Sequence, residues 1–371
     1  MKEPILRKQI GFTMVEFLVA TAISLVLIAA AVGAFSDALR SNEVVTLTAD
    51  MNDNLRASID LISRDLLFAG TGIPASGIGI PSGAGVTINR PDLNPLTFAG
   101  TTLPAVSLGT GLGPAVQVSD TSASANPGTP SDILTLLYQD NTWNNGESMD
   151  SSPIIRAAVG ATPACNGTIS PTGDSVTFDA ACNDLSKARV PIQAGDLILF
   201  TNTAGATAIQ TVTAVNGQQL SFAKNPSIDV FGFNQTGAPQ GTILQLQSPN
   251  GTWPSISATR IFMVTYYLDN VADPLRPRLM RQVNFYTPQP VGDVVEALTV
   301  RYNFVDASTP PTFYPMQSTV PPGLSEGNIR SVNIFLGARS NRPQSRTSKY
   351  LRDNMSMQVS LRSLSYFNRY Q

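Results

Sequence analysis

Glu16 is the residue whose position most needs a chemical explanation, because it is a carboxylate inside an apolar stretch. It is the only charged residue in the 24-residue run from Phe12 to Phe35. An unpaired carboxylate within a membrane segment is costly. Gly11 lies just before the run. Glu16 follows Phe12, the first residue of the run, by four positions. Any interpretation of the run must therefore account for this charge.

Other candidate catalytic and metal-binding groups are few. The chain has no histidine, which excludes Ser–His and Cys–His nucleophiles and histidine metal ligation. Asp269, Asn270 and Asp273 lie close in sequence, but they lack the spaced ligand set of a known calcium loop. A turn between two strands is the interpretation we favour for them. We expect no enzyme activity, no metal and no cofactor.

The two cysteines, Cys165 and Cys182, are separated by 16 residues in a turn-rich segment. An isolated pair in an exported region most simply predicts one disulfide bond. Two free thiols are the alternative.

The run from Phe12 to Phe35 is long enough to cross a bilayer as a helix. The residues before it include Lys2, Arg7 and Lys8. The positive-inside rule therefore keeps Met1 cytoplasmic and places the rest of the chain outside. A secretory signal peptide would be cut after the run, near Ala29–Val32, but the run is long and contains a carboxylate. A plain membrane anchor explains the length and leaves Glu16 unexplained.

A helical pattern continues beyond the apolar run. Apolar residues recur every three or four positions at Leu47, Met51, Leu55, Ile59, Ile62 and Leu66. The pattern predicts one helix from Phe12 to about Phe68, about 85 Å long. Gly70, Gly72 and Pro74 then stop it. Gly33 is the weak point, and either local melting or a harmless glycine fits this position.

The remaining chain reads as a β-rich, extracytoplasmic part. Only 13% of residues are charged, and Ser, Thr, Asn, Gln, Gly and Pro are abundant. Residues 71–131 read as a long loop or meander. Strands are expected at Asp132–Tyr138, Asp196–Thr201, Ala208–Val215, Gln219–Phe222, Thr259–Leu268, Arg278–Tyr286, Val294–Phe304, Asn328–Ala338 and Met355–Leu361. Asn216-Gly217 predicts a hairpin turn.

The charge distribution argues against nucleic acid as a partner. The formal net charge is −2, which is not typical of a general nucleic-acid binder. From Arg330 to the end, however, there are eight Lys and Arg and one acid, Asp353. Arginines at strand ends and in loops are the favoured explanation. Contact with an acidic neighbour subunit, an anionic surface or DNA is the second.

The sequence Gly11-Phe12-Thr13-Met14-Val15-Glu16 resembles the type IV prepilin signature. The resemblance implies that a prepilin peptidase cuts the leader, residues 1–11, after Gly11 on the cytoplasmic side. Phe12 then becomes an N-methylated amino terminus, and the apolar run is retained. It also implies that Glu16 pairs with the N-terminal ammonium of a neighbouring subunit. Burying the two charges together recovers much of the cost of burying either alone.

Several later segments resemble PilW-like minor pilins, a group related to the minor pseudopilin PulJ. They are Ile59–Leu66 with Phe68–Gly70, Gly195–Phe200, Thr265–Leu268, Val295–Leu298, Ile334–Ser340 and Val359–Leu364. The resemblance implies an α+β fold in which a long N-terminal helix packs on an antiparallel, pilin-like β-domain. The expected organisation is helix 12–70 and globular part 71–371, with a β-rich insert at about 186–230.

The resemblance implies a minor pilin of a type IV pilus that takes part in a priming complex, at or near the tip. Its expected partners are the prepilin peptidase, other minor pilins, the major pilin and the bacterial inner membrane. It would cross that membrane once, with a cytoplasmic N-terminus, and assemble in the periplasm or at the cell surface. Two alternatives stay open: a minor pseudopilin of a type II secretion system, and a membrane-anchored adhesin that binds through residues 71–190.

Overall fold

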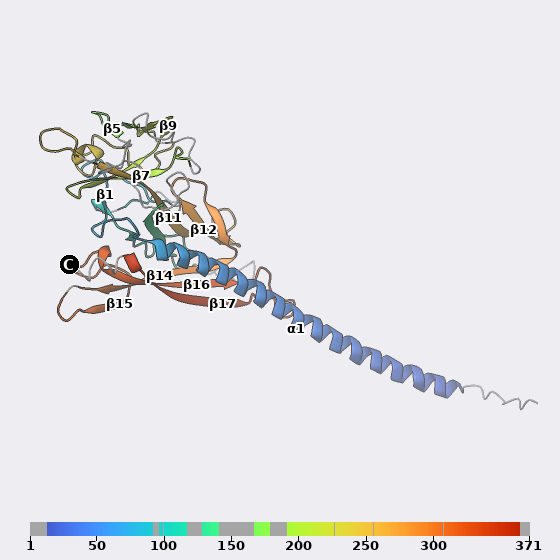
Figure 1. Cartoon of the computed structure of the whole chain (residues 1–371). Coiled ribbons are helices and arrows are strands. Elements are labelled where there is room, and N and C mark those ends of the chain that lie inside the picture. Colours follow the sequence, from blue (N-terminus) through green and yellow to red (C-terminus); the bar gives the residue numbers. More distant parts are fainter. Residues whose placement is uncertain are drawn as a thin grey trace, which may run out of the picture.

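A single long helix projects from a β-rich globular part (Figure 1). The computed structural model describes residues 13–91, 96–98, 100–116, 128–140, 167–178, 191–225, 227–254, 256–306 and 308–363. The helix, α1, spans Met14–Phe68. Its second half packs on antiparallel strands, and its first half extends alone. The expected α+β class is confirmed.

Capping and hydrophobic spacing define α1. Thr13 is the N-cap, and the N–H of Ala69 bonds the carbonyls of Asp65 and Leu66 at the other end. Gly70 follows with φ 82°, a backbone conformation that glycine adopts without strain. The buried face is the predicted one: Leu47, Met51, Leu55, Ile59, Ile62 and Leu66. The helix is continuous through Gly33.

The C-terminal sheet lies directly against the second half of α1. Its strand order is β15-β14-β16-β17, and all neighbours are antiparallel. The bounds are β14 (Val295–Val305), β15 (Phe313–Gln317), β16 (Ile329–Arg339) and β17 (Arg352–Ser360), with a 3-10 turn, η2 (Glu326–Asn328), before β16. Apolar side chains on one face, including Leu298, Ile334 and Leu336, form one core with the helix stripe.

The central sheet is organised by one long strand, β11 (Ile256–Asp269). Its second half pairs with β4 on one side and β12 on the other, and its first half pairs with β7. The other members are β3 (Val106–Ser107), β4 (Leu134–Gln139), β7 (Leu197–Asn202), β8 (Thr207–Thr211), β12 (Arg278–Val283) and β13 (Gln289–Gly292). Through β11, this sheet connects the helix-bound core to a second core farther from the helix.

That second core lies in the part of the molecule farthest from the free end of α1 (Figure 1). A four-stranded sheet of order β5-β6-β10-β9 covers it. The strands are β5 (Gly167–Ile169), β6 (Ser175–Phe178), β9 (Ala214–Asn216) and β10 (Gln219–Ser221), and η1 (Ile243–Leu246) packs beside them. Two of these strands, β5 and β6, precede the insert expected at about 186–230.

One expected strand, Ala208–Val215, is wrong as a single element. It is two strands, β8 and β9, which belong to different sheets. Between them the N–H of Val212 donates to the backbone carbonyl of Asp196, and the N–H of Thr213 donates to the backbone carbonyl of Ser221. The chain therefore changes sheets at these two residues. The predicted hairpin is present between β9 and β10, with Gly217 (φ 64°) as its first loop residue.

The meander after the helix contributes more to the core than its composition predicts. It contains β1 (Ile78–Gly79), β2 (Thr102–Leu103) and β3, and the first two pair with each other. Its buried apolar residues include Ile73, Ile78, Ile80, Ile88, Phe98, Leu103 and Val106, which all join the helix-bound core. The expectation of a loop is correct for most of its backbone, but the segment is an integral part of the packing.

Candidate assembly site on the N-terminal helix

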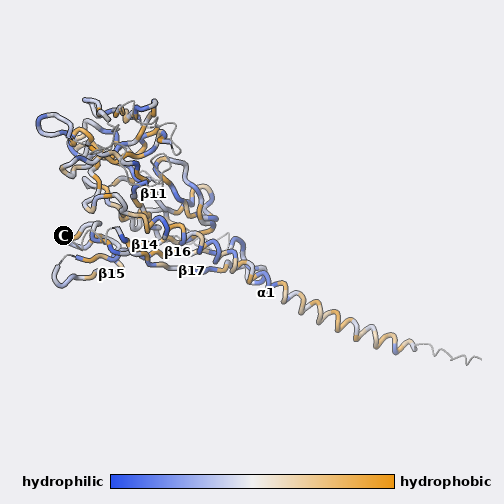
Figure 2. The backbone as a smooth tube through the Cα atoms, viewed as in Figure 1, coloured by the Kyte–Doolittle hydropathy of each residue, from blue (hydrophilic) through white to orange (hydrophobic). Residues whose placement is uncertain are grey.

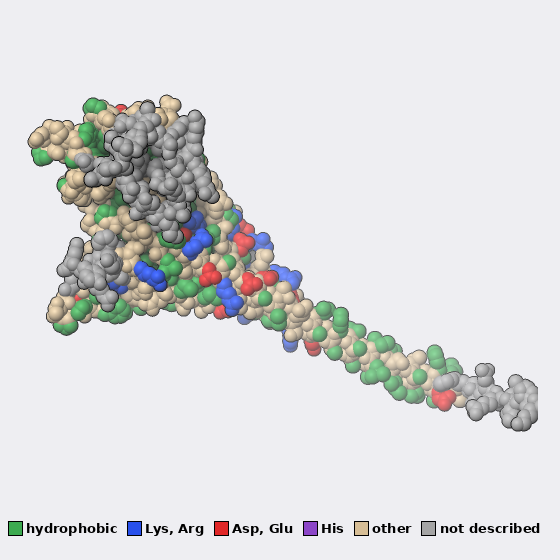
Figure 3. Space-filling view, viewed as in Figure 1, with side chains coloured by type: hydrophobic (Ala, Val, Ile, Leu, Met, Phe, Trp, Pro, Cys, Tyr) green, Lys and Arg blue, Asp and Glu red, His purple; other side chains and the backbone are tan. Residues whose placement is uncertain are grey.

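The first half of α1 exposes apolar side chains around its whole circumference. Consecutive residues such as Phe17, Leu18 and Val19 are 66%, 64% and 51% exposed. Figure 2 shows this part of the helix as predominantly hydrophobic, and Figure 3 shows apolar side chains along it. A helix that is apolar on every side needs burial in a membrane or among other helices. Within the described residues, α1 is the one helix long and apolar enough to cross a membrane.

Glu16 caps the start of this helix. Its Oε2 accepts the Thr13 N–H at 3.0 Å and the Thr13 hydroxyl at 2.9 Å. The Thr13 Oγ1 in turn accepts the Glu16 N–H at 3.3 Å. The two residues therefore form a reciprocal capping box that satisfies N–H groups the helix cannot bond itself.

This cap leaves chemical capacity on the same carboxylate. All of its described hydrogen bonds use Oε2, and Oε1 has none among the residues that the structure describes. A carboxylate offers about four acceptor positions, so Glu16 can cap its own helix and still accept an external cation. Gly11 and Phe12, the predicted cleavage and methylation positions, lie outside the described residues.

The second half of α1 is fixed to the globular part through Asp65, which is 2% exposed. The hydroxyl of Tyr266 donates to its carboxylate at 2.6 Å, Arg281 Nε at 2.8 Å and the hydroxyl of Tyr138 at 3.4 Å. Burial, together with the Asp65 charge, raises the pKa of Tyr138 to about 12 and also raises that of Tyr266. Both hydroxyls therefore stay protonated and keep donating.

A close backbone approach accompanies this attachment. Ser58 of α1 donates to the carbonyl of Val291 at 3.0 Å. A Cβ on the next residue, Gly292, would lie 2.5 Å from the Ser58 Oγ. A side chain at this position would therefore displace the Ser58 hydroxyl from its bond to Val291. Asn54 adds bonds to both backbone groups of Asp293.

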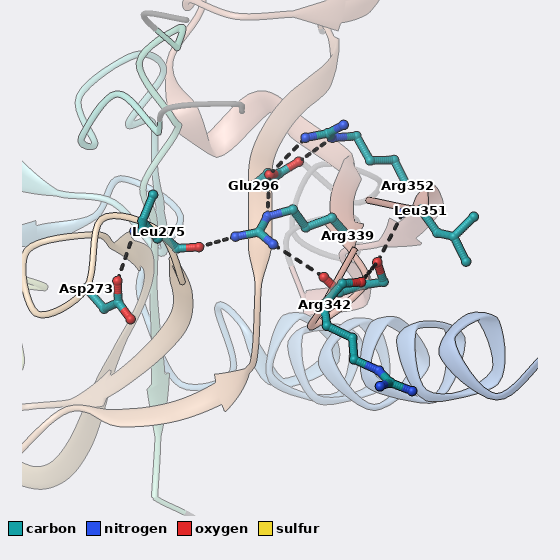
Figure 4. Close-up of polar contacts among 8 residues, drawn as sticks. Asp273, Leu275, Glu296, Arg339, Arg342, Leu351 and Arg352 are labelled. Carbon is teal, nitrogen blue, oxygen red and sulfur yellow. Dashed lines mark hydrogen bonds and ion pairs between the residues drawn. The ribbon is translucent and has the colours of Figure 1, made fainter. Parts of the chain in front are cut away.

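Near the junction of the two halves of α1, the helix also contacts the loop between β16 and β17, residues 340–351. Ser345 donates to Glu43 Oε1 at 2.8 Å, and Arg342 lies 3.6 Å from the same oxygen. Figure 4 shows the side chain of Arg342 extended over α1. Lys, Arg, Asp and Glu side chains gather where the helix enters the globular part (Figure 3).

The base of this loop is held by a charge cluster around the buried carboxylate of Glu296. Glu296 pairs with Arg339 and Arg352, each at 2.8 Å, and Arg339 also donates to the carbonyl of Leu275 (Figure 4). The ring of Tyr350 lies 3.9 Å from the Arg339 guanidinium carbon. These two arginines of the basic C-terminal stretch therefore have a structural role, as the favoured interpretation predicts.

One further sequence prediction, the turn at Asp269–Asp273, has a definite outcome. Asp269 accepts from the Val271 N–H and pairs with Arg278, and Asp273 accepts from the Leu275 N–H. The turn interpretation is therefore confirmed. The described residues contain no cluster of three acidic, cysteine or histidine residues able to hold a metal ion. Cys165 and Cys182 lie outside those residues.

Sequence reasoning missed Asp65 and Glu296 as structural centres. A signal for Asp65 was present, because it lies three residues after Ile62, on the apolar stripe of the helix. A carboxylate at a core-facing position requires partners. Glu296 offers no such signal, since it occupies a β-bulge between Val295 and Ala297.

Residues 6–32 match the family described as the prokaryotic N-terminal methylation motif. The match spans Gly11, Phe12 and Glu16 and covers a short part of the chain. No curated protein and no solved structure shows a significant match. The methylation motif, together with the exposed apolar helix, supports a membrane-anchored, type IV pilin-like or pseudopilin protein.

Proposed function

We propose that this protein is a minor pilin of a type IV pilus, a structural subunit that helps to prime filament assembly, in the manner of PilW-like proteins. The observation that carries the proposal is the division of α1. Residues 14–35 expose an apolar surface with one carboxylate, Glu16, while residues 47–68 are committed to the globular part. One half is thus available to other subunits, and the other half carries the domain.

Processing precedes assembly in this proposal. The prepilin peptidase removes residues 1–11 at the cytoplasmic face of the inner membrane, and Phe12 becomes the methylated terminus. The backbone N–H of Thr13 is an amide before and after this cut. The capping box therefore survives cleavage, and Glu16 Oε1 is left for the ammonium of a neighbouring subunit.

The size of the globular part favours a minor subunit over a repeating one. About 300 residues follow the helix. The second core and its sheet extend well to one side of the line that α1 defines (Figure 1). Such a projection is hard to repeat at every subunit of a filament and is accommodated at a tip or at low copy number.

A minor pseudopilin of a type II secretion system would use the same helix in the same way. Genes for pilus-type minor pilins or for secretion components beside this one would distinguish the two. The adhesin alternative has less support, because residues 73–106 supply core side chains.

Immunogold labelling of sheared filaments tests the proposal, with purification of the tagged full chain from detergent extracts in parallel. We expect sparse labelling, concentrated at filament ends, and recovery of other pilin-like subunits with the tagged chain. Regular labelling along the filament would identify a major subunit. Absence from filaments and from subunit complexes would contradict the proposal.

We also propose that Cys165 and Cys182 form a disulfide bond. Closing a loop of this length is worth about 3 kcal/mol in the chain-entropy model. Thiol labelling of the denatured, unreduced protein should give no label, and labelling after reduction should give two. Two labels without reduction would rule out the bond.

A further inference from the structure

A groove separates α1 from the loop between β16 and β17, directly beyond the apolar run. It has a volume of about 300 Å³. The helix contributes Asp37, Arg40, Ser41, Glu43 and Val44, and the loop contributes Gln344, Arg346 and Thr347. We propose that this groove binds the headgroup of an anionic phospholipid while the chain is anchored in the membrane. The inference rests on the membrane insertion that the proposed function includes.

The position of the groove along the helix supports a lipid occupant. Asp37 lies two residues after Phe35, and Val44 lies nine residues after it, so the groove covers about 3 to 14 Å beyond the apolar run. A bilayer has about 30 Å of hydrocarbon and about 40–45 Å in total, which leaves a headgroup layer of about 5–8 Å on each side. The membrane-side end of the groove therefore opens at headgroup level.

The charges at the groove favour an anion. Arg342, Arg346 and Lys349 of the loop are exposed, and Arg346 lines the groove together with Arg40 of the helix. Among the described residues, the side chains of Arg346 and Lys349 have no hydrogen bond or ion pair. Long basic side chains extend to the headgroup layer and contact phosphate there.

The two acids of the groove do not cancel these cations. Glu43 is 13% exposed and is already bonded to Ser345 and Arg342. Asp37 is 76% exposed and lies 3.3 Å from Arg40 in an exposed pair, which is worth little in water. Arg346 and Lys349 therefore remain in excess, and Arg40 can exchange Asp37 for a phosphate.

Lipid selectivity of the full chain tests the site directly. The chain is reconstituted in phosphatidylcholine membranes, and spin-labelled phosphatidylglycerol and phosphatidylcholine are compared for association with the protein. A Lys or Arg at an anionic surface changes an association constant about fivefold. We expect phosphatidylglycerol to associate about fivefold more strongly, and we expect the difference to shrink at high salt.

The variant R40Q/R346Q should bring the two lipids to near-equal association. Its matched control, R64Q/K224Q, removes the same charge from exposed positions away from the groove. Arg64 lies about 43 Å beyond Phe35 along the helix, so this control should keep the selectivity. Replacing chloride by inorganic phosphate at equal ionic strength should change nothing if a membrane headgroup is the ligand.

Three results would overturn the proposal. They are equal association of both lipids with the unmodified chain, full selectivity in R40Q/R346Q, and loss of selectivity in inorganic phosphate. If lipid selectivity is absent but R40Q/R346Q no longer recovers other subunits, the groove binds an acidic neighbour instead. Absence of any protein-associated lipid would contradict membrane insertion itself. That result differs from one in which both lipids associate with the protein equally.

Discussion

The two halves of α1 share one unbroken helix but bury their apolar residues in different ways. In residues 47–68, apolar side chains form a stripe, and polar residues such as Asp60 and Arg64 face solvent. In residues 14–35, apolar side chains surround the helix, and Glu16 is the one charge. The second half therefore finds its partners within the chain. The first half needs partners outside it, which a membrane and then a filament would provide in turn.

Blocking leader removal should have the largest effect on the first half. Gly11→Val places a bulky residue at the predicted cut, so the precursor should accumulate uncleaved in the membrane. N-terminal mass analysis of the extracted protein measures this. Gly33→Ala is the matched control, because it changes another glycine of the apolar segment in open space and should leave cleavage intact. A mature chain that starts near Gly33 would identify an ordinary signal peptide.

Glu16→Leu should leave insertion and cleavage unchanged but remove the chain from subunit complexes. The neighbour's ammonium would then lack a partner in a low-dielectric environment. Recovery of other pilin-like subunits and a count of surface pili measure the effect. Glu16→Gln separates two roles of the carboxylate, because the amide oxygen can still cap Thr13 but carries no charge. Normal assembly in both variants would mean that this carboxylate does not drive assembly.

Equal truncations in the two halves should differ strongly in stability. Leu55 is fully buried and Leu25 is 68% exposed. Leu55→Ala should lower the free energy of unfolding by about 2–5 kcal/mol. Leu25→Ala should change it by less than about 0.5 kcal/mol in detergent. Denaturant unfolding of the detergent-solubilised chain measures both. Similar losses would mean that the first half also packs within the chain.

Asp65→Asn should have a smaller effect than Leu55→Ala. The amide keeps the shape and an acceptor for Tyr266, but it loses the charge that faces Arg281. A hydrogen bond to a charged group is worth about 1.5–3 kcal/mol, so a loss of about 2 kcal/mol is expected in the same unfolding experiment. Asp60→Asn, an exposed change on the same helix, should be near neutral. Equal effects would show that the buried position of Asp65 is unimportant.

Much of this fold was predictable from local patterns. The helix stripe, its stop at Gly70 and most long strands follow from the spacing of apolar residues within each segment. The strand expected at Ala208–Val215 failed because apolar alternation continues across the residues where the chain changes sheets. The core residues of 73–106 were missed because they are spaced without a helix or strand period.

The candidate site was predictable in part. Gly11, Phe12 and Glu16 stand out because their signal is local, and they stay predictions for experiment. The partners of Asp65 are not local: Tyr266 lies 201 residues away and Arg281 lies 216 residues away. Ser345, which donates to Glu43, lies 302 residues after it in the sequence. Such pairings depend on how the sheets close around the helix, which no single segment specifies.

The attachment of α1 also has a mechanical consequence. Asp65 lies about 73 Å from Glu16 along a continuous helix, so tension applied to the first half reaches the globular part directly. The contacts from Leu47 to Leu66 are spread over about 28 Å along the direction of pull. They are therefore loaded together, in shear, when α1 is pulled along its axis. The helix should detach at a higher force in that direction than when it is pulled sideways, because sideways pulling breaks the contacts one after another, starting at Leu47.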